Sequence, residues 1–161
     1  MKTIVIIGAG QYGNNVRDII VSNGSYESIV FADDNSCLAE YTIDESIALD
    51  NVDYCIAIGN ANARETIFNK IISKGKRVAT IIHKSAFVAT SAQVEEGCIV
   101  EPNVSIGANA TIKKSSLICY NAVVNHNATV GEYAQIDIGA VVKAGANIKA
   151  KQKVESGQVN V

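Results

Sequence analysis

The sequence is short of several residue types, and each shortage excludes a class of protein. Its formal net charge is −2, so it lacks the basic excess that nucleic-acid-binding proteins direct at phosphates. No run of 18 or more apolar residues occurs, which excludes a membrane-spanning helix. The four cysteines form no Cys-x-x-Cys pair, so we expect reduced, inert thiols in a cytoplasmic protein and no disulfide framework.

The first half of the chain alternates between strand-like and helix-like segments. The β-branched run at 2–7 predicts a buried first strand rather than a signal peptide, because it leads directly into a glycine motif. Apolar spacing predicts a helix over 11–23, and a second predicted helix over 63–75 ends in glycine. Further strands are expected at 28–32, 53–58 and 77–82. This order predicts an α/β domain with a parallel sheet over residues 1–82.

The second half, residues 83–161, has a period of six. Two positions before most of its aliphatic residues stands a small one, from Ala92 to Ala146. Such a period is typical of a β-solenoid in which each flat face uses one hexapeptide and the aliphatic residue fills the core. Three faces make a coil of about 18 residues, so residues i and i+18 stack one strand spacing apart. The aliphatic positions are Val88, Val94, Val100, Ile106, Ile112, Ile118, Val124, Val130, Ile136, Val142, Ile148 and Val154.

A glycine motif, GxGxxG at Gly8, Gly10 and Gly13, lies between the first strand and the first helix. Glycines there let the backbone approach a phosphate at the helix N-terminus. An NAD site is one interpretation, because Asp33 follows Gly13 by 20 residues. Against it, residues 1–82 lack the second mononucleotide-binding half that holds nicotinamide. A tight structural turn is the other alternative.

We favour a half-site that holds the nucleotide part of a larger ligand. The backbone around the glycine motif would contact the phosphate, and an acidic side chain after the second strand would bind base or ribose. Residues after the 53–58 strand would line the same edge of the sheet. The predicted substrate-binding residues are Gly8, Gly10, Gln11, Tyr12, Asp33, Asp34, Gly59 and Asn60.

His126, in the segment VNHN, interrupts the aliphatic repeat. A neutral imidazole is a natural proton acceptor for an attacking amine or hydroxyl near pH 7. Its neighbours one coil away are Ala108 and Ala144, whose small side chains leave room for a ligand. Asn125 and Asn127 flank the histidine, and either could orient the ring, contact a substrate or form the turn. His83 is expected to be structural.

The motifs GAGQYG, FADDN, AIGNANAR and VNHN, together with the repeat, resemble one family over the full length. It comprises the bacterial sialic acid O-acetyltransferases and nucleotide amino-sugar N-acetyltransferases. The resemblance implies a Rossmann-like domain followed by a left-handed parallel β-helix of hexapeptide repeats. It also implies a homotrimer with active sites between subunits.

The resemblance further implies acetyl-CoA as co-substrate, no metal, and transfer of acetyl to a UDP- or GDP-linked 4-amino sugar for surface glycan synthesis. His126 would be the general base, with Asn127 beside it in the catalytic site. The backbone of Ala144 would face the reacting oxygen. Lys143 and Lys149, among the lysines of the last coils, would contact CoA phosphates.

Three alternatives stay open. Sialic acid O-acetylation is scarcely separated from N-acetylation by the sequence. A zinc hydrolyase like the β-helical carbonic anhydrases would need three histidines, and the chain has two. A non-catalytic scaffold is the third, because Asn127 and Gln135 replace an acidic residue and a histidine found in family members. The family's C-terminal Gly-Asn-Pro-Ala segment also has no counterpart before the final ESGQVNV.

Overall fold

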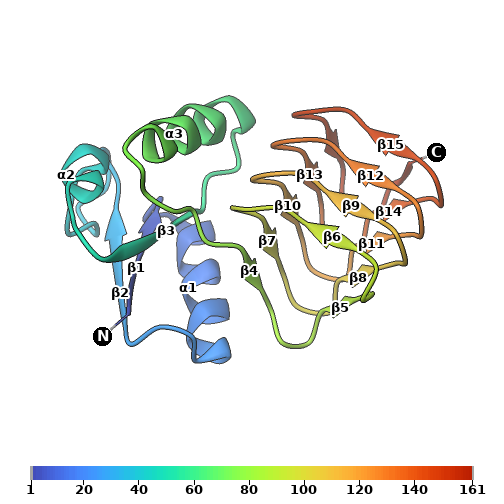
Figure 1. Cartoon of the computed structure of the whole chain (residues 1–161), viewed down its shortest axis with the longest axis horizontal. Helices are drawn as coiled ribbons and strands as arrows, with labels where there is room; N and C mark the ends of the chain where they lie inside the picture. The colour runs from blue at the N-terminus through green and yellow to red at the C-terminus, as the bar shows by residue number, and fades with distance from the viewer. Residues whose placement is uncertain (1, 161) are drawn as a thin grey trace. The chain divides into compact units, whose positions relative to one another are not determined.

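The computed structural model describes residues 2–160; Met1 and Val161, at the outer ends of the two predicted domains, lie outside that range. The chain divides into two compact units between Ala79 and Thr80, whereas the predicted boundary followed residue 82. Figure 1 shows an α/β unit and a solenoid.

The N-terminal unit is built on a parallel sheet of strand order β2-β1-β3. The central strand β1 is buried from Ile4 to Ile7, as its uninterrupted aliphatic run predicts. Helix α1 ends at Gly24, whose φ of +66° suits a glycine C-cap. The predicted strands and helices of this unit are confirmed to within two residues, apart from the segment at 77–82. The elements are β1 (Thr3–Ile7), α1 (Gln11–Asn23), β2 (Ser28–Ala32), α2 (Ile43–Ile47), β3 (Val52–Ile56) and α3 (Ala61–Ser73).

The strand expected over residues 77–82 is not a single strand, so that prediction was wrong. Val78 forms a bridge with Tyr54 in the N-terminal unit. Strand β4 (Ile81–Ile82) instead pairs with β7 (Ile99–Val100) of the solenoid. One apolar run therefore serves two units, because its residues suit a buried strand in either.

The solenoid is a left-handed parallel β-helix, as predicted, with three faces formed by three parallel sheets. Partners in neighbouring coils are 18 residues apart, as in the pairs Val124 with Val142 and Val130 with Ile148. The remaining strands are β5 (Phe87–Val88), β6 (Gln93–Val94), β8 (Ser105–Ile106), β9 (Thr111–Ile112), β10 (Leu117–Ile118), β11 (Val123–Val124), β12 (Thr129–Val130), β13 (Gln135–Ile136), β14 (Val141–Val142), β15 (Asn147–Ile148), β16 (Lys153–Val154) and β17 (Val159–Asn160).

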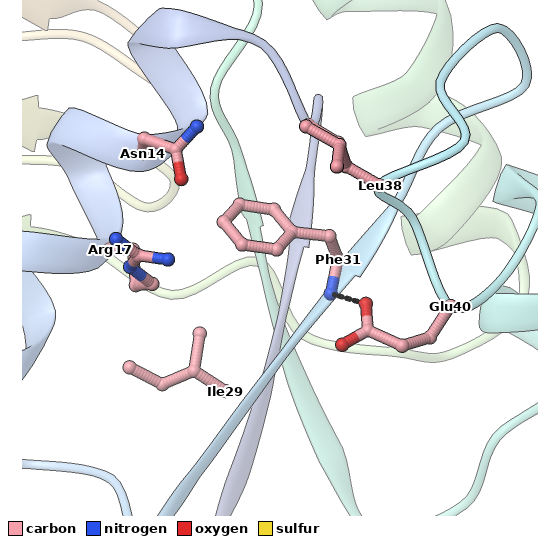
Figure 2. A pocket seen from close by; sticks show the side chains of 7 residues that line it. Asn14, Arg17, Ile29, Phe31, Leu38 and Glu40 are labelled. Carbon is pink, nitrogen blue, oxygen red and sulfur yellow. Dashed lines mark hydrogen bonds between the residues drawn. The ribbon is translucent and has the colours of Figure 1, made fainter.

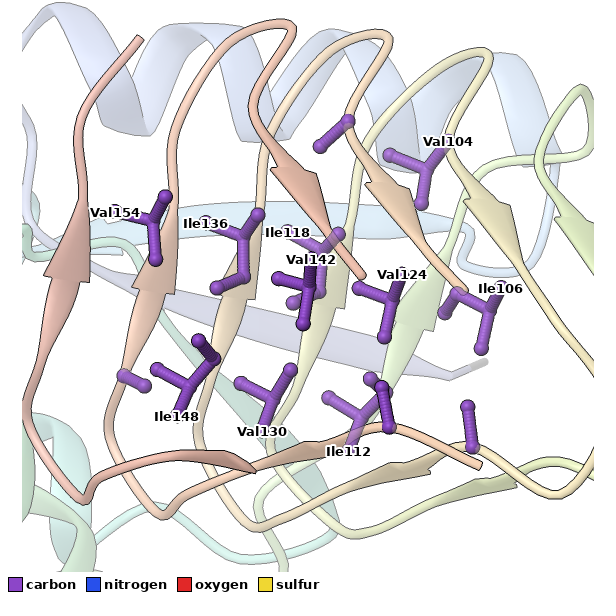
Figure 3. Close-up of a cluster of buried hydrophobic side chains, with 14 of the residues drawn as sticks. Val104, Ile106, Ile112, Ile118, Val124, Val130, Ile136, Val142, Ile148 and Val154 are labelled. Carbon is purple, nitrogen blue, oxygen red and sulfur yellow. The ribbon is translucent and has the colours of Figure 1, made fainter. Parts of the chain in front are cut away.

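The interior of the solenoid is filled by the hexapeptide aliphatic residues (Figure 3). From Val100 to Val154 these side chains are at most 2% exposed, and alanines such as Ala122 and Ala128 are buried beside them. Burial of apolar surface stabilises by about 25 cal/mol per Å². The repeat residues therefore form the core of the solenoid, and the corner segments between the strands are free to carry functional side chains.

No helix within residues 2–160 is long and apolar enough to cross a membrane. All four cysteines, Cys37, Cys55, Cys98 and Cys119, are free thiols, and only Cys37 is exposed.

Candidate functional site

His126 occupies the middle of a solenoid corner and its side chain is exposed. The corner is the segment between β11 and β12, and hydrogen bonds to both neighbouring coils hold its backbone. The Asn127 N–H donates to the Ala108 carbonyl at 2.9 Å, and the Gly145 N–H donates to the His126 carbonyl at 3.0 Å. The imidazole is thus carried by a fixed backbone and faces outward.

The predicted neighbours of His126 are confirmed by the strand register, which places Ala108 and Ala144 one coil away on either side. Both alanines are exposed, so the positions one coil away on either side of the histidine carry only methyl groups. The Ala144 backbone N–H has no acceptor among residues 2–160. It is therefore a donor that could serve an oxygen of a ligand.

The two asparagines that flank His126 have different partners. The Asn125 side-chain oxygen accepts the His126 backbone N–H at 2.7 Å, so Asn125 fixes the turn. The Asn127 amide nitrogen lies 2.9 Å from Nδ1 of the imidazole, and its backbone has a φ of +58°. Asn127 therefore forms the corner and also contacts the ring, which leaves Nε2 as the outward nitrogen.

The two predicted CoA-binding lysines lie at different corners. Lys143 follows β14 and is one coil beyond Asn125, in the same row of corners as His126. Lys149 follows β15, in the next row, and its backbone N–H donates to the Gln152 side chain at 3.0 Å. The solenoid therefore places Lys143 beside the His126 corner and Lys149 on another edge.

His83 follows β4 in a third row of corners. Its Nδ1 lies 2.8 Å from the Ser85 hydroxyl oxygen and accepts the Ser85 backbone N–H at 3.1 Å. These contacts within one turn favour the structural role predicted for it.

The three motif glycines have distinct physical roles. Gly8 has a φ of +105°, and a Cβ atom there would lie 2.7 Å from the Ala57 carbonyl oxygen. A Cβ on Gly13 would lie 1.9 Å from the Gly8 oxygen, so α1 packs directly on the loop. A Cβ atom on Gly10 would meet no other atom within 4 Å, and Gly10 has an ordinary φ of −82°. The fold therefore requires glycine at 8 and 13, whereas the space before Gly10 is open.

The N-terminus of α1 carries no side-chain cap at Gly10. The backbone N–H groups of the first turn, which includes Gln11 and Tyr12, point out of the helix end. The aligned peptide dipoles add partial positive charge there, which favours an anion. The predicted phosphate-binding segment thus has the donors that the motif implies.

Asp33 and Asp34 hold the loops at the end of β2. Asp33 accepts the Ala9 backbone N–H at 2.9 Å and the Asn35 backbone N–H at 2.8 Å. Asp34 accepts the Ile43 backbone N–H at 2.8 Å at the start of α2. Asp33 therefore ties the glycine loop to the β2 end, and the binding of a ribose or base by Asp33 or Asp34 stays a prediction.

The loop after β3 is supported by a residue that the sequence reasoning did not single out. Arg64 is fully buried, and its guanidinium donates to the carbonyls of Ile58 and Gly59 at 2.7 and 2.9 Å. Asn60 caps α3 by accepting the Ala63 N–H at 3.0 Å. The motif AIGNANAR contains this arginine. Its position in the first turns of α3, five residues after Gly59, was the feature of the sequence from which this contact could have been predicted.

Two hollows of about 320 Å³ each lie near the end of β2. The first, which we call the α3 hollow, contains Asp34 and the α3 residues Ala63, Thr66, Ile67 and Lys70. The second, the α1 hollow of Figure 2, is lined by Asn14, Arg17, Ile29, Phe31, Leu38 and Glu40. In the α1 hollow the Glu40 carboxylate accepts the Phe31 backbone N–H at 2.7 Å. The α3 hollow is lined by residues of α3, the helix that follows β3, and the strand order reverses between β1 and β3.

Among residues 2–160, no three His, Cys, Asp or Glu side chains gather in a way that could hold a metal ion.

Comparison with known proteins adds to this geometry. Residues 3–71 match the family described as the PglD N-terminal domain. The whole chain is similar to the acetyltransferase domain of PglB from Neisseria gonorrhoeae FA1090, solved in complex with acetyl coenzyme A. The two are 23% identical, with 99% of this chain and 90% of that chain covered and a TM-score of 0.83.

A mutant of perosamine N-acetyltransferase from Caulobacter crescentus, in complex with CoA and GDP-perosamine, also has a TM-score of 0.83. It is 22% identical, with 99% of this chain and 88% of that chain covered. WeeI from Acinetobacter baumannii AYE is 17% identical, with 96% of each chain covered and a TM-score of 0.64. These likenesses establish the fold, and the fold predicted from the family resemblance is confirmed.

Proposed function

We propose that this protein transfers acetyl from acetyl-CoA to the amino group of a nucleotide-linked amino sugar. The observation that carries the proposal is the exposed imidazole of His126, between Ala108 and Ala144, with its Nε2 facing outward. Two similar folds support it, since one was solved with acetyl coenzyme A and one with CoA and GDP-perosamine. A UDP- or GDP-linked 4-amino sugar for surface glycan synthesis is the substrate that we propose.

In the proposed reaction the amine nitrogen attacks the thioester carbonyl carbon. Nε2 of His126 accepts the proton that the nitrogen loses as the C–N bond forms. The carbonyl oxygen becomes an oxyanion, for which the Ala144 N–H is the proposed donor. The C–S bond then breaks, and the CoA thiolate takes the proton from the imidazolium.

The nucleotide is proposed to bind the N-terminal unit. Its diphosphate would accept hydrogen bonds from the first turn of α1, in the open space before Gly10. Asp33 would bind the ribose while it keeps its contact with Ala9. The base would enter the α3 hollow beside Asp34, and Gly59 and Asn60 would line its path. This arrangement follows the general position of ligands at the reversal point of parallel sheets.

For acetyl-CoA, Lys143 is the better placed of the two predicted lysines, because it shares the row of corners with His126. Its ammonium group would contact a CoA phosphate. Lys149 lies along a different edge of the solenoid. We therefore propose that it contacts a different phosphate of CoA from Lys143, or that it does not contact CoA.

We propose a homotrimer with active sites between subunits. The outward column of one solenoid face is mostly apolar and consists of Phe87, Ser105, Val123, Val141 and Val159. Phe87 and Val159 are 64% and 57% exposed in the single chain. Packing this column against a second copy would bury it next to the His126 corner, which adjoins the same face. We also propose that the reaction takes place in the cytoplasm, where acetyl-CoA and nucleotide sugars are found.

The decisive assay measures thiol release from acetyl-CoA with UDP-, GDP- and dTDP-linked 4-amino sugars and free sialic acid. Release with one nucleotide amino sugar, lost in His126→Ala, is the expected result. Release with sialic acid alone would favour O-acetylation instead. Failure of the chain to bind acetyl-CoA by calorimetry would contradict both and favour a scaffold.

A further inference from the structure

Three side chains from two coils form one hydrogen-bonded chain at the His126 corner. Asn109 and Asn127 are 18 residues apart and both have a φ of +58°. The Asn109 amide nitrogen donates to the Asn127 side-chain oxygen at 3.3 Å. The Asn127 amide nitrogen in turn lies 2.9 Å from Nδ1 of His126.

The direction of this chain determines the tautomer of the imidazole. A side-chain amide has one donor end and one acceptor end, so Asn127 presents its N–H to His126 when its oxygen is taken by Asn109. A neutral imidazole has one acceptor and one donor nitrogen. With Nδ1 as the acceptor, as in this arrangement of the two amides, the ring carries its proton on Nε2.

We infer that Asn109 is a positioning residue for His126 and sets, through Asn127, which ring nitrogen carries the proton. If both amides turn by half a rotation, Asn127 accepts from Nδ1–H and donates to Asn109. That second state keeps the same two hydrogen bonds and frees Nε2 to accept a proton. The catalytic part of this inference rests on the proposed function, because a general base at Nε2 requires the second state.

A pair of side-chain amides can hydrogen-bond to either tautomer of the imidazole, whereas a carboxylate can hydrogen-bond to only one. A carboxylate only accepts hydrogen bonds, so an acidic residue at position 127 would hold the proton on Nδ1 permanently. The amide of Asn127 satisfies either tautomer, and its own orientation is then decided by what position 109 offers. Control of the ring therefore lies one coil away from it.

The test is Asn109→Asp, read by ¹⁵N NMR of the histidine side chains in the full chain at a pH where the ring is neutral. Asp at 109 only accepts, so the Asn127 nitrogen should turn towards it and its oxygen towards Nδ1. We expect wild type to show the proton on Nε2. In the variant the tautomer ratio should shift towards Nδ1–H by about tenfold or more, as for a hydrogen bond to a charged group.

Three variants complete the experiment. Asn127→Asp should give the Nδ1–H tautomer directly and serves as the positive reference. Asn121→Asp makes the same charge change at a corner on another edge, where φ is +57°, and should leave the tautomer unchanged. Asn109→Gly keeps the positive φ and removes the amide, so the wild-type preference for Nε2–H should be lost.

The outcomes separate this inference from the proposed function. If wild type carries the proton on Nδ1, or if Asn109→Asp leaves the His126 signals unmoved while Asn127→Asp moves them, the inference is wrong. If the tautomer follows Asn109 but no variant releases thiol from acetyl-CoA, the relay stands and the proposed function fails. Where both hold, Asn109→Asp should raise kcat while KM for the sugar nucleotide stays within about twofold.

Discussion

Gly107 lies directly against the backbone of His126. A Cβ atom on Gly107 would be 2.7 Å from the His126 backbone nitrogen and 3.0 Å from the Asn125 carbonyl carbon. The coil that carries the imidazole therefore rests on a residue that has no side chain, and any side chain there must displace the histidine.

The first prediction uses this contact. Gly107→Ala should lower kcat for acetyl transfer by about tenfold or more, because a displacement near 1 Å in a reacting group is that costly. Gly131→Ala is the matched control, since its Cβ would lie 2.5 Å from the Ala150 nitrogen, away from His126. Both should lose about 1–3 kcal/mol of stability by overpacking, measured by urea unfolding. Equal activity loss in both variants would argue against a specific effect on His126.

His126→Ala and His126→Gln should keep the fold and lower turnover by about 10² or more, because the proton acceptor is lost. The side chain is exposed, so neither change opens a cavity. Far-UV circular dichroism and Tm measure the fold, and thiol release measures turnover. Near-normal turnover in both variants would remove the general-base assignment. His83→Gln is the control and should retain activity.

The glycine loop offers a matched pair of substitutions. Gly10→Val should weaken sugar-nucleotide binding by about tenfold or more, since a side chain there fills the space in which the phosphate would approach. Acetyl-CoA binding should be unchanged, because Gly10 has open space and a φ that valine accepts. Gly13→Val should unfold the N-terminal unit, given the 1.9 Å approach to Gly8. Calorimetry with each ligand separates the two effects.

The position of the nucleobase can be tested by filling each hollow in turn. Thr66 is exposed on α3, so Thr66→Tyr is compatible with the helix and should raise KM for the nucleotide sugar by about tenfold. Arg17→Ala, in the α1 hollow, should leave KM within about twofold. The reverse result would move the base to the α1 hollow, against Phe31.

Thiol labelling tests the burial of the cysteines. Burial raises the pKa of the Cys55 thiol to about 12, so little thiolate forms near neutral pH. Burial, followed by the nearby Glu101 and Asp137 carboxylates, also raises the pKa of Cys119. Iodoacetamide should label Cys37 alone in the native protein and all four cysteines in urea, as counted by mass spectrometry. Labelling of Cys119 in native protein would contradict the closed core.

The solenoid could be predicted from the sequence almost in full, because its strand register follows from counting 18 residues from one coil to the next. Once Val124 and Val142 are known to stack, every corner residue has its neighbour assigned, including Ala108 and Ala144 for His126. The contact between Asn109 and Asn127 has the same spacing of 18 residues. It escaped prediction because its meaning depends on how two amides are turned, which spacing does not determine.

The N-terminal unit was less predictable where one segment had two possible partners. The run at 77–82 is β-prone throughout, and only the tertiary contacts assign Val78 to one unit and Ile81 to the other. Helix α2 was missed because five residues carry too little periodicity, although Thr42 and Glu45 form a capping box. The roles of Asp33 and Asp34 as backbone acceptors could not be predicted, since they depend on loop geometry.

The corner positions with positive φ have a consequence for how such proteins diverge. In this chain the same left-handed backbone is occupied by asparagine, serine, tyrosine, lysine and glycine, as at Asn127, Ser115, Tyr133, Lys151 and Gly145. A lineage can therefore exchange the chemistry presented along an edge without disturbing the aliphatic interior. Drift of this kind would let proteins share a fold at a TM-score of 0.83 with 22–23% identity, and would let new acceptor specificities arise by substitution at single corners.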